Sequence, residues 1–388
     1  MLPKTARGVR RRRTPQWTRW LIGLGLLLLV ASGGSLVGVR VLVGSATREV
    51  PRENLLGKAR PTTERKRAEI KGAKNILLVG LDTRPSWADK QPSRSDSIIL
   101  LHIPADRSAA YMISLPRDSY VDIPAYDNGK QSYAGGRNKI NSAFAFGSRG
   151  LSGRAAESHG FELLALTVKK LTGITPDAGA IIDFTGFKQV VQVLGKVCMY
   201  VDEDTTSIHV GHTASGKTAV PYTTDSAGLH PRRVKGVTPN FYAKGNHCFT
   251  PVEALDFARQ RDLLKNKDSD YGRQRHQQQL LKAILRQAVH DGLNSPAKLP
   301  RLVSAIAKTM TVDDGGISLE DWAFAMRTID PDDLITIKTN DGKFNSRSVA
   351  GVGSVEILSK TTMSLLKSAK SDDLESFVQA NPGWVVKT

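Results

Sequence analysis

The chain has 388 residues, 40% of them apolar, and a formal net charge of +18. This length and apolar content suit one large globular domain or two smaller ones, and no internal repeat or low-complexity segment is visible. The charge would suit a nucleic-acid-binding protein, but most of it lies outside the predicted fold. Residues 1–20 hold seven basic residues and no acid, and only +5 remains after Lys74.

An uncharged apolar run, Leu21–Val39, follows the basic N-terminus. As a helix it would span about 28 Å, close to the thickness of a bilayer core. Trp17 and Trp20 stand at its basic end, as interfacial aromatic residues do. We therefore predict a cytoplasmic tail over 1–20, a single transmembrane helix over 21–44 and an extracellular remainder. A cleaved signal peptide is the alternative, although its apolar core is usually shorter.

Residues 45–74 are charged and contain few large apolar side chains, which predicts a juxtamembrane linker. A short surface helix is the alternative for this segment. After it, short β-branched apolar runs predict core strands. These are Asn75–Leu81, Ser97–Ile103, Tyr111–Leu115, Ala178–Asp183, Val197–Val201 and Leu334–Lys338.

Segments with a helical pattern alternate with these strands. They are Asn141–Gly147, Phe161–Leu171 with Gly173 as its C-cap, Phe184–Leu194, Pro251–Arg261, Tyr271–His290, Leu299–Met310, Leu319–Thr328 and Ser354–Ala369. The polar segment Glu203–Tyr242 is predicted to form a loop or hairpin. The alternation predicts a single α/β domain over residues 75–388, with a mixed sheet flanked by helices.

Charged residues stand at the ends of the first three predicted strands: Asp82, Arg84, Arg94, Asp96, Arg117 and Asp118. Such residues beside core strands must be paired or hydrated, so they rarely serve stability. Two carboxylates with several arginines indicate a metal ion and a multiply charged anion such as phosphate. Asp82 and Asp96 could hold Mg²⁺, or they could be ordinary turn aspartates.

A second group of candidate phosphate ligands lies later in the chain. Arg259 and Arg261 would point about 200° apart on a continuous helix, so they share a ligand only if the helix ends or bends. Arg273 and Gln277 are an i, i+4 pair in the first turns of the next predicted helix, where the dipole favours an anion. Lys139 could add a phosphate contact or be solvated. Taken alone, the polar run around Arg273 is usual for a solvated helix face.

Two cysteines, Cys198 and Cys248, both fall in the predicted extracellular part. An oxidising compartment favours one disulfide over two buried thiols. The chain has no phosphate-binding lysine loop, no dinucleotide-binding glycine triplet, no zinc-ligand spacing and no Gly-x-Ser-x-Gly elbow. Serine and zinc hydrolases therefore lack support.

Six motifs occur in order over about Lys74–Gln287. They are Gly80-Leu-Asp82-Thr-Arg84, Arg94-Ser-Asp96-Ser, Leu115-Pro-Arg117-Asp118-Ser, Asn138-Lys139-Ile-Asn141, Arg259-Gln-Arg261, and Asp270-Tyr-Gly-Arg273 followed by Gln277. Together they resemble the signature of the LytR–CpsA–Psr family, with the motif core at 75–287. The segment before Gly245 and the link between Arg261 and Arg273 look longer than in that family.

The resemblance implies a membrane-anchored phosphotransferase. Such enzymes move a secondary cell-wall glycopolymer, of the teichoic acid or arabinogalactan type, from a polyprenyl diphosphate carrier to the muramic acid 6-hydroxyl of peptidoglycan. By position, Asp82 and Asp96 would bind Mg²⁺ or Mn²⁺, and Asp118 could accept the hydroxyl proton or simply pair with Arg117. The residues expected to hold the diphosphate are Arg94, Arg117, Lys139, Arg259, Arg261, Arg273 and Gln277. Apolar helices near the site would enclose the prenyl tail.

Three other functions remain open at this stage. One is a pyrophosphatase that uses water to release the glycan from its polyprenyl carrier. Another is a non-catalytic envelope protein that binds polymers. The third is a membrane-tethered transcription regulator, which would need a nucleic-acid-binding module that about 20 tail residues cannot form. We therefore expect no nucleic-acid partner.

Overall fold

The computed structural model describes residues 52–60, 70–81, 95–225, 230–294, 310–318, 321–322, 326 and 329–386. Within these ranges, no helix combines the length and apolar character needed to cross a bilayer. The predicted tail and transmembrane helix, residues 1–44, lie outside the described residues, and so does most of the predicted helix Leu319–Thr328.

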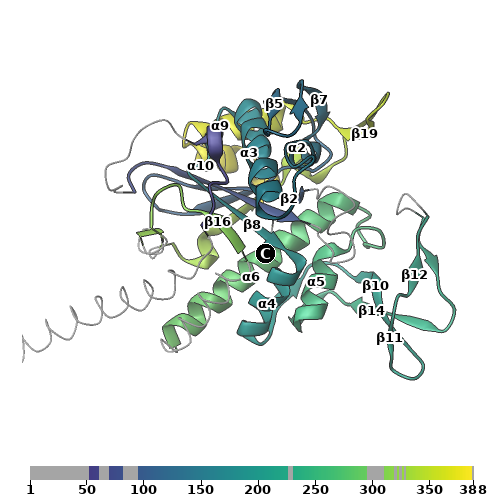
Figure 1. Ribbon diagram of the computed structural model, residues 1–388. Coiled ribbons are helices and arrows are strands. Elements are labelled where there is room, and N and C mark those ends of the chain that lie inside the picture. The colour runs from purple at the N-terminus through teal and green to yellow at the C-terminus, as the bar shows by residue number, and fades with distance from the viewer. Residues whose placement is uncertain are drawn as a thin grey trace, which may run out of the picture.

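A six-stranded mixed sheet forms the centre of the molecule (Figure 1). Its order is β16-β8-β1-β2-β3-β17. The strands are β1 (Lys74–Leu81), β2 (Ser95–Ile103), β3 (Ala110–Ser114), β8 (Ala178–Asp183), β16 (Met310–Asp313) and β17 (Leu334–Ile337). β1 pairs antiparallel with β2 and parallel with β8, and β3 pairs antiparallel with β2 and parallel with β17. The predicted mixed sheet is confirmed.

Helices cover both faces of this sheet (Figure 1). One face carries α2 (Ile140–Gly147), α3 (Gly153–Thr172), α9 (Lys360–Lys370) and α10 (Leu374–Ala380), and the other carries α4 (Phe184–Leu194), α5 (Pro251–Arg259) and α6 (Ser269–Asn294). The largest core cluster joins β1 and β2 to α2 and α3 through side chains such as Leu77, Leu100 and Phe161. A second cluster joins α4, α5 and α6 through residues such as Val191, Phe257 and Leu280.

Short strand pairs surround the central sheet. β9 (Val197–Val201) pairs with β15 (Gly245–Phe249), and β10 (Thr205–Thr213) pairs with β11 (Thr218–Ala219) and β14 (Val237–Tyr242). The others are β4 (Tyr120–Ile123) with β7 (Gly136–Lys139), β5 (Tyr126–Asp127) with β6 (Ser132–Tyr133), β12 (Tyr222–Thr223) with β13 (Arg232–Arg233), and β18 (Ser346–Val349) with β19 (Gly353–Glu356). The predicted hairpin in Glu203–Tyr242 is therefore present, and it projects from the domain (Figure 1).

Local sequence signals explain several of these boundaries. Gly173 ends α3 in the left-handed conformation, at φ 70°, and its N–H donates to the Lys169 carbonyl. Thr250 and Glu253 form a reciprocal capping box at the start of α5. Asp183 caps α4 by accepting a hydrogen bond from the Gly186 N–H.

Four boundary predictions need correction. The helix predicted at Pro251–Arg261 ends at Arg259, because Gln260 is extended (φ −69°, ψ 133°). The helix predicted at Leu299–Met310 cannot include Met310, which begins β16. The helix predicted at Ser354–Ala369 is instead β19 followed by α9, because Ser359 caps a helix starting at Lys360.

The fourth correction concerns the predicted linker, part of which belongs to the folded domain. Leu55 and Leu56 are fully buried in the largest core cluster. Asp313 holds this segment, since its carboxylate accepts a hydrogen bond from the Leu56 N–H at 2.9 Å and pairs with Arg60 at 2.7 Å. Two consecutive leucines are enough to dock a short segment whose remaining composition is polar.

Candidate active site

The candidate site lies at the edge of the sheet where β1 and β3 end and β2 begins. Asp96 is the second residue of β2, and Arg117 follows the end of β3. The N-terminal turns of α6 meet the same edge. Gln278 on α6 donates a hydrogen bond to Ser114 Oγ at 2.8 Å, which fixes the helix against β3.

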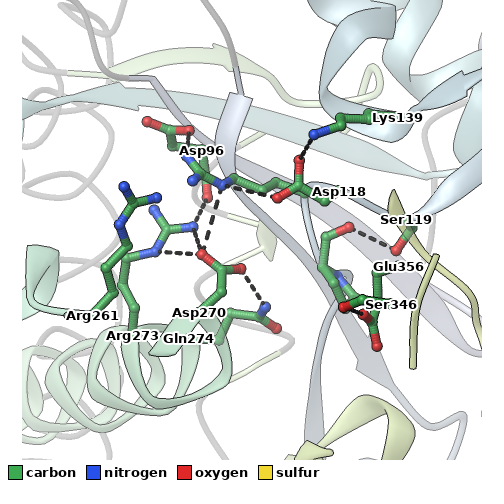
Figure 2. A network of polar contacts seen from close by, with 12 residues as sticks. Asp96, Asp118, Ser119, Lys139, Arg261, Asp270, Arg273, Gln274, Ser346 and Glu356 are labelled. Carbon is green, nitrogen blue, oxygen red and sulfur yellow. Dashed lines mark hydrogen bonds and ion pairs between the residues drawn. The ribbon is translucent and has the colours of Figure 1, made fainter. Parts of the chain in front are cut away.

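Asp270, in the first turn of α6, connects two arginines that the sequence places in separate motifs (Figure 2). Arg273 donates to Asp270 Oδ1 through Nε (3.0 Å) and Nη2 (2.7 Å), and its Nη2 also donates to the Asp96 carbonyl oxygen at 2.9 Å. Arg117 Nη1 lies 2.5 Å from Asp96 Oδ1, and its Nε lies 3.6 Å from Asp270 Oδ1. The structure therefore brings Asp96, Arg117 and Arg273 together.

Two members of this network, Asp270 and Arg117, stay charged at neutral pH. Burial by itself raises the pKa of Asp270, but Arg273 and Arg117 lower it by more, so the pKa of Asp270 lies below its ordinary value. Burial likewise lowers the pKa of Arg117, but Asp96, Asp270 and Asp118 outweigh it, so that pKa is raised. Arg117 Nε is also buried and has no hydrogen-bond partner of good geometry among the described residues.

Asp118 and Lys139 extend the network toward β7. Lys139 Nζ lies 2.9 Å from Asp118 Oδ1, whereas Arg117 Nε lies 3.8 Å from Asp118 Oδ2. Lys139 is therefore the main partner of Asp118, a pairing that the sequence did not predict. Both side chains are partly exposed, so they remain reachable from solvent.

Arg261 approaches the same region from the loop after α5. The loop is fixed by Gln260, whose Nε2 donates to Asp256 Oδ1 at 2.7 Å and whose Oε1 accepts from the Ile208 N–H at 3.0 Å. Arg261 itself lies 3.5 Å from Asp262 and is about one-quarter exposed. Figure 2 shows the side chains of Arg261, from this loop, and Arg273, from α6, next to each other and both extending toward Asp96.

Arg259 and Gln277 are placed differently from this group. The Arg259 guanidinium lies 4.8 Å from the centre of the Phe184 ring at the start of α4, a cation–π geometry. Gln277 Nε2 donates to the Ala258 carbonyl at 3.2 Å and so joins α6 to α5. α5 does end at Arg259, the condition under which Arg259 and Arg261 could share a ligand, but Arg259 lies against Phe184 and Arg261 lies beside Asp262.

A buried carboxylate from the C-terminal part of the chain, that of Glu356, lies next to the charged network, near Ser119 and Ser346 (Figure 2). Glu356 Oε1 accepts hydrogen bonds from Tyr271, Asn340 and the Asn345 N–H, each at 2.8 Å. The Glu356 N–H donates in turn to the Asp118 carbonyl at 2.9 Å. Burial, with help from Glu356, raises the pKa of Tyr271, so its hydroxyl remains a donor at neutral pH. The C-terminal region thus positions Arg117 and Asp118.

Asp82 and Arg94, and Arg84 with them, lie outside the described residues. Leu81, the residue before Asp82 in the sequence, ends β1 and pairs with Ser95, the residue before Asp96. Asp96 Oδ2 receives no hydrogen bond from the described residues. A carboxylate oxygen next to the strand end that leads into Asp82 fits the oxygen-rich coordination that Mg²⁺ requires.

Two members of the network, Asp270 and Gln274, are not among the predicted site residues. Gln274 Nε2 donates to Asp270 Oδ2 at 3.0 Å and completes the hydrogen bonding of that carboxylate. The available signal was the spacing of Asp270 and Arg273, since residues three apart on a helix face each other. Gly272 lies between them, where a Cβ would collide with Asp268 and Leu264.

The two cysteines form a disulfide away from these charges. Cys198 on β9 and Cys248 on β15 are directly paired residues of the two-stranded sheet, and their Sγ atoms are bonded. β9 leads directly into Asp202 and Glu203, so the disulfide supports the strand end that precedes those acids.

Comparison with known proteins finds a matching family model and relatives of similar sequence. The model of the LytR_cpsA_psr family matches residues 41–369. The regulatory protein MsrR of Staphylococcus aureus is 28% identical over 260 residues, covering 66% of this chain. The match spans about 62% of the length of that relative. The teichoic acid transferase TagU of Bacillus cereus is 25% identical over 296 residues, which is 76% of this chain and 79% of TagU.

Solved structures agree at the level of the fold. Protein gbs0355 from Streptococcus agalactiae superposes with a TM-score of 0.56 at 23% identity, covering 78% of this chain and 88% of its own. TagV of Bacillus subtilis superposes with a TM-score of 0.50 at 20% identity, covering 79% and 98%. At such identities, the likeness establishes the α/β architecture and leaves the chemistry to the residues described above.

Proposed function

This chain belongs to the LytR–CpsA–Psr family, and from that premise we propose that it transfers a glycopolymer from a polyprenyl diphosphate carrier to peptidoglycan. Two relatives support this reaction class by name: TagU of Bacillus cereus and TagT of Bacillus subtilis are polyisoprenyl-teichoic acid–peptidoglycan teichoic acid transferases. A structure of TagT bound to LI-WTA shares the fold, with a TM-score of 0.50. The identity of the polymer on this chain's carrier is part of the proposal.

The single observation that carries the proposal is the convergence of Arg117 and Arg273 on Asp96 and Asp270. Guanidinium groups from two distant parts of the chain meet beside a carboxylate at a strand end. Planar guanidinium groups bind phosphate oxygens in pairs, and a diphosphate needs several such donors at once. Arg261 supplies a further guanidinium that is partly exposed.

In the proposed reaction, the muramic acid 6-hydroxyl oxygen attacks the phosphorus next to the glycan. A new phosphorus–oxygen bond forms, the bond to the bridging oxygen breaks, and polyprenyl phosphate leaves with the electron pair. The hydroxyl proton passes to Asp118, whose carboxylate is partly exposed beside Lys139. Arg117, Arg261 and Arg273 hold the two phosphates in line and stabilise the charge that builds up on their oxygens.

Mg²⁺ bound by Asp82 and Asp96 would neutralise charge on the diphosphate in this reaction. Arg117 would orient Asp96 for metal binding, because it donates to only one carboxylate oxygen and leaves the other available to the ion. Mn²⁺ has the same ligand preference and could substitute.

The substrate class also accounts for the proposed location. We propose that the apolar segment 21–44 anchors the chain in the cell membrane, with residues 1–20 in the cytoplasm and the domain outside. A polyprenyl carrier is available at that surface. Val193 on α4 and Leu285 and Val289 on α6 are large apolar side chains that remain exposed, and the prenyl tail could lie against them.

The test uses the purified full-length chain in detergent with lipid-linked donor, peptidoglycan and Mg²⁺, scored for polymer attached covalently to peptidoglycan. We expect Arg261→Ala to abolish attachment. Arg286→Ala is the matched control, because Arg286 is exposed on α6 and pairs with Asp332 away from the site. Attachment by Arg261→Ala at the wild-type rate contradicts the proposal. Release of free polymer phosphate without attachment would instead identify a pyrophosphatase.

A further inference from the structure

A second charged cluster lies where the end of β9 meets α6, and the proposed transfer does not use it. Arg275 on α6 forms ion pairs with three carboxylates, those of Asp202, Glu203 and Asp268. Its Nε lies 2.6 Å from Asp202 Oδ2. One guanidinium therefore faces three carboxylates, which leaves two negative charges uncompensated in a region where Glu203 is almost completely buried.

His276, the next residue on α6, is fully buried beside these acids. Its ring stacks on Phe257 with centroids 4.2 Å apart. Neither ring nitrogen has a hydrogen-bond partner among the described residues, and neither does Asp202 Oδ1. Buried polar atoms without partners are rare in native proteins, so three of them in one cluster call for a ligand.

The distances indicate which kind of ligand fits. His276 Nε2 lies 3.5 Å from Glu203 Oε1 and 3.7 Å from Asp202 Oδ1, too far for good hydrogen bonds. Two ligand atoms of one tetrahedral metal ion, each bonded at about 2.0–2.1 Å, lie about 3.3–3.5 Å apart. All three ligand atoms fall within 4.8 Å of one another. The two histidine distances need a change of only a few tenths of an ångström, and the third separation, within 4.8 Å, would have to close by at most about 1.4 Å for all three atoms to bind one ion.

We propose that Asp202, Glu203 and His276 bind a divalent transition-metal ion, with Zn²⁺ as the ion that suits one imidazole and two carboxylates. A charge of +2 cancels the two uncompensated negative charges of the cluster. An imidazole ligand disfavours Mg²⁺, which prefers oxygen ligands and its own water. The short Cys and His spacings of zinc motifs are absent because the ligands come from two distant segments.

The neighbours of this site orient its ligands in the manner of other metal centres. Arg275 holds the oxygen of Asp202 that faces away from His276, and the Asn266 N–H donates to Glu203 Oε2 at 2.7 Å. The bound ion would fix α6, the helix that carries Arg273, to the end of β9, and it acts as a structural ion.

The experiment measures zinc binding by the full-length chain in detergent, with any affinity tag removed. The protein is stripped with a chelator, supplied with excess Mg²⁺ to fill the proposed Asp82–Asp96 site, and titrated with Zn²⁺. Zinc retained after gel filtration is then counted by mass spectrometry. We expect one zinc ion per wild-type chain, and at least about 100-fold weaker binding in Asp202→Asn and His276→Gln.

Two control variants separate this site from its surroundings. Asp204→Asn changes the next carboxylate in the chain, which pairs with Lys265 instead, and should keep the zinc ion. Asp96→Asn should keep it too, because Asp96 belongs to the transfer site. Equal zinc retention in wild type, Asp202→Asn and His276→Gln would overturn the proposal.

A spectroscopic measurement on the wild-type protein avoids any dependence on folding of the variants. X-ray absorption at the zinc edge should show one imidazole nitrogen together with oxygen ligands. A wild-type chain that retains no stoichiometric zinc, or whose zinc has no imidazole neighbour, rules the site out.

Discussion

Two charged clusters occupy different faces of the same helix, and they differ in charge balance and in access to solvent. The first, at Arg273, combines Arg117, Lys139, Arg261 and Arg273 with four aspartates: Asp96, Asp118, Asp262 and Asp270. Its charges cancel. The second, at Arg275, has three carboxylates for one guanidinium. Several members of the first cluster are partly exposed, whereas Glu203 and His276 in the second are buried.

The difference indicates what each cluster can accept. A diphosphate diester carries two negative charges, which one divalent cation cancels, so a balanced and exposed cluster suits a metal–diphosphate complex. A buried cluster with an excess of two negative charges suits a bare divalent cation. Neighbouring residues of one helix can therefore serve substrate binding and structure separately, because successive side chains point about 100° apart.

The largest expected effect tests the first cluster. Arg117→Lys keeps the charge but loses the planar guanidinium that joins Asp96 to Asp270. We expect polymer transfer to fall by about 10³-fold, in line with arginines that stabilise phosphoryl transfer. Zinc content should remain at the wild-type level. Rates of attachment to peptidoglycan, with Arg137→Lys on β7 as the control, give the measurement, and near-normal transfer by Arg117→Lys would separate this arginine from the chemistry.

The second prediction tests whether the disulfide helps to position the carboxylates of the second cluster. Replacing Cys198 and Cys248 by serine removes a cross-link between residues 50 apart in sequence. The chain-entropy model predicts a loss of about 4 kcal/mol in the free energy of unfolding. Because β9 leads into Asp202 and Glu203, zinc affinity should fall while transfer per folded molecule stays near normal. Denaturant unfolding and zinc titration of the same variant measure both, and an unchanged zinc affinity would show that β9 does not position the metal ligands.

The third prediction distinguishes the two arginines on α6. Arg275→Ala leaves Asp202, Glu203 and Asp268 without their cation, and removing one partner of a buried pair costs about 3 kcal/mol or more. Added zinc should restore part of that stability, since it supplies positive charge to the same carboxylates. Thermal unfolding with and without zinc gives the measurement, and Arg286→Ala serves again as the control. A stability loss that zinc leaves untouched would argue against a shared set of ligands.

Much of the fold was predictable because its core strands are short apolar runs bounded by polar residues. Val197–Val201 and Ala178–Asp183 are strands with the expected bounds. The start of the helix predicted at Ser354–Ala369 was placed six residues too early, because Val355 and Glu356 pair with β18 in a short hairpin whose strand signal was taken for the first turn of the helix. The burial of Leu55 and Leu56 was missed for a different reason, because it depends on residues far away in the sequence, such as Asp313.

The site was predictable in part. Motif residues Arg117, Arg273 and Asp96 meet, and α5 ends at Arg259, but Arg259 and Arg261 have different partners. The partners of these residues were not predictable. The pairing of Lys139 with Asp118, and the position of Glu356 behind the site, depend on segments brought together only by the tertiary fold. The sequence shows which residues carry a charge, whereas the partner of each charged residue depends on how distant segments are placed by the tertiary fold.

The smallest expected effect concerns acid stability of the first cluster. The pKa of Asp270 is lowered, because Arg273 and Arg117 outweigh burial. A carboxyl whose pKa is lower in the folded than in the unfolded state stabilises the fold above its unfolded value, about 4, and that contribution is lost as the pH falls through the folded value. Wild type should therefore be more stable than Asp270→Asn from pH 7 down to about 5.

The two proteins should become equally stable only once the pH falls below the lowered folded-state pKa of Asp270, where the carboxyl is protonated in both states. Asp122→Asn, which changes an exposed carboxylate on β4, should follow the wild type throughout. Denaturant unfolding across this pH range provides the comparison. If the stability gap instead widened on acidification, the Asp270 carboxylate would be a strained charge tolerated by the fold, and its two arginines would be held in place by something other than this ion pair.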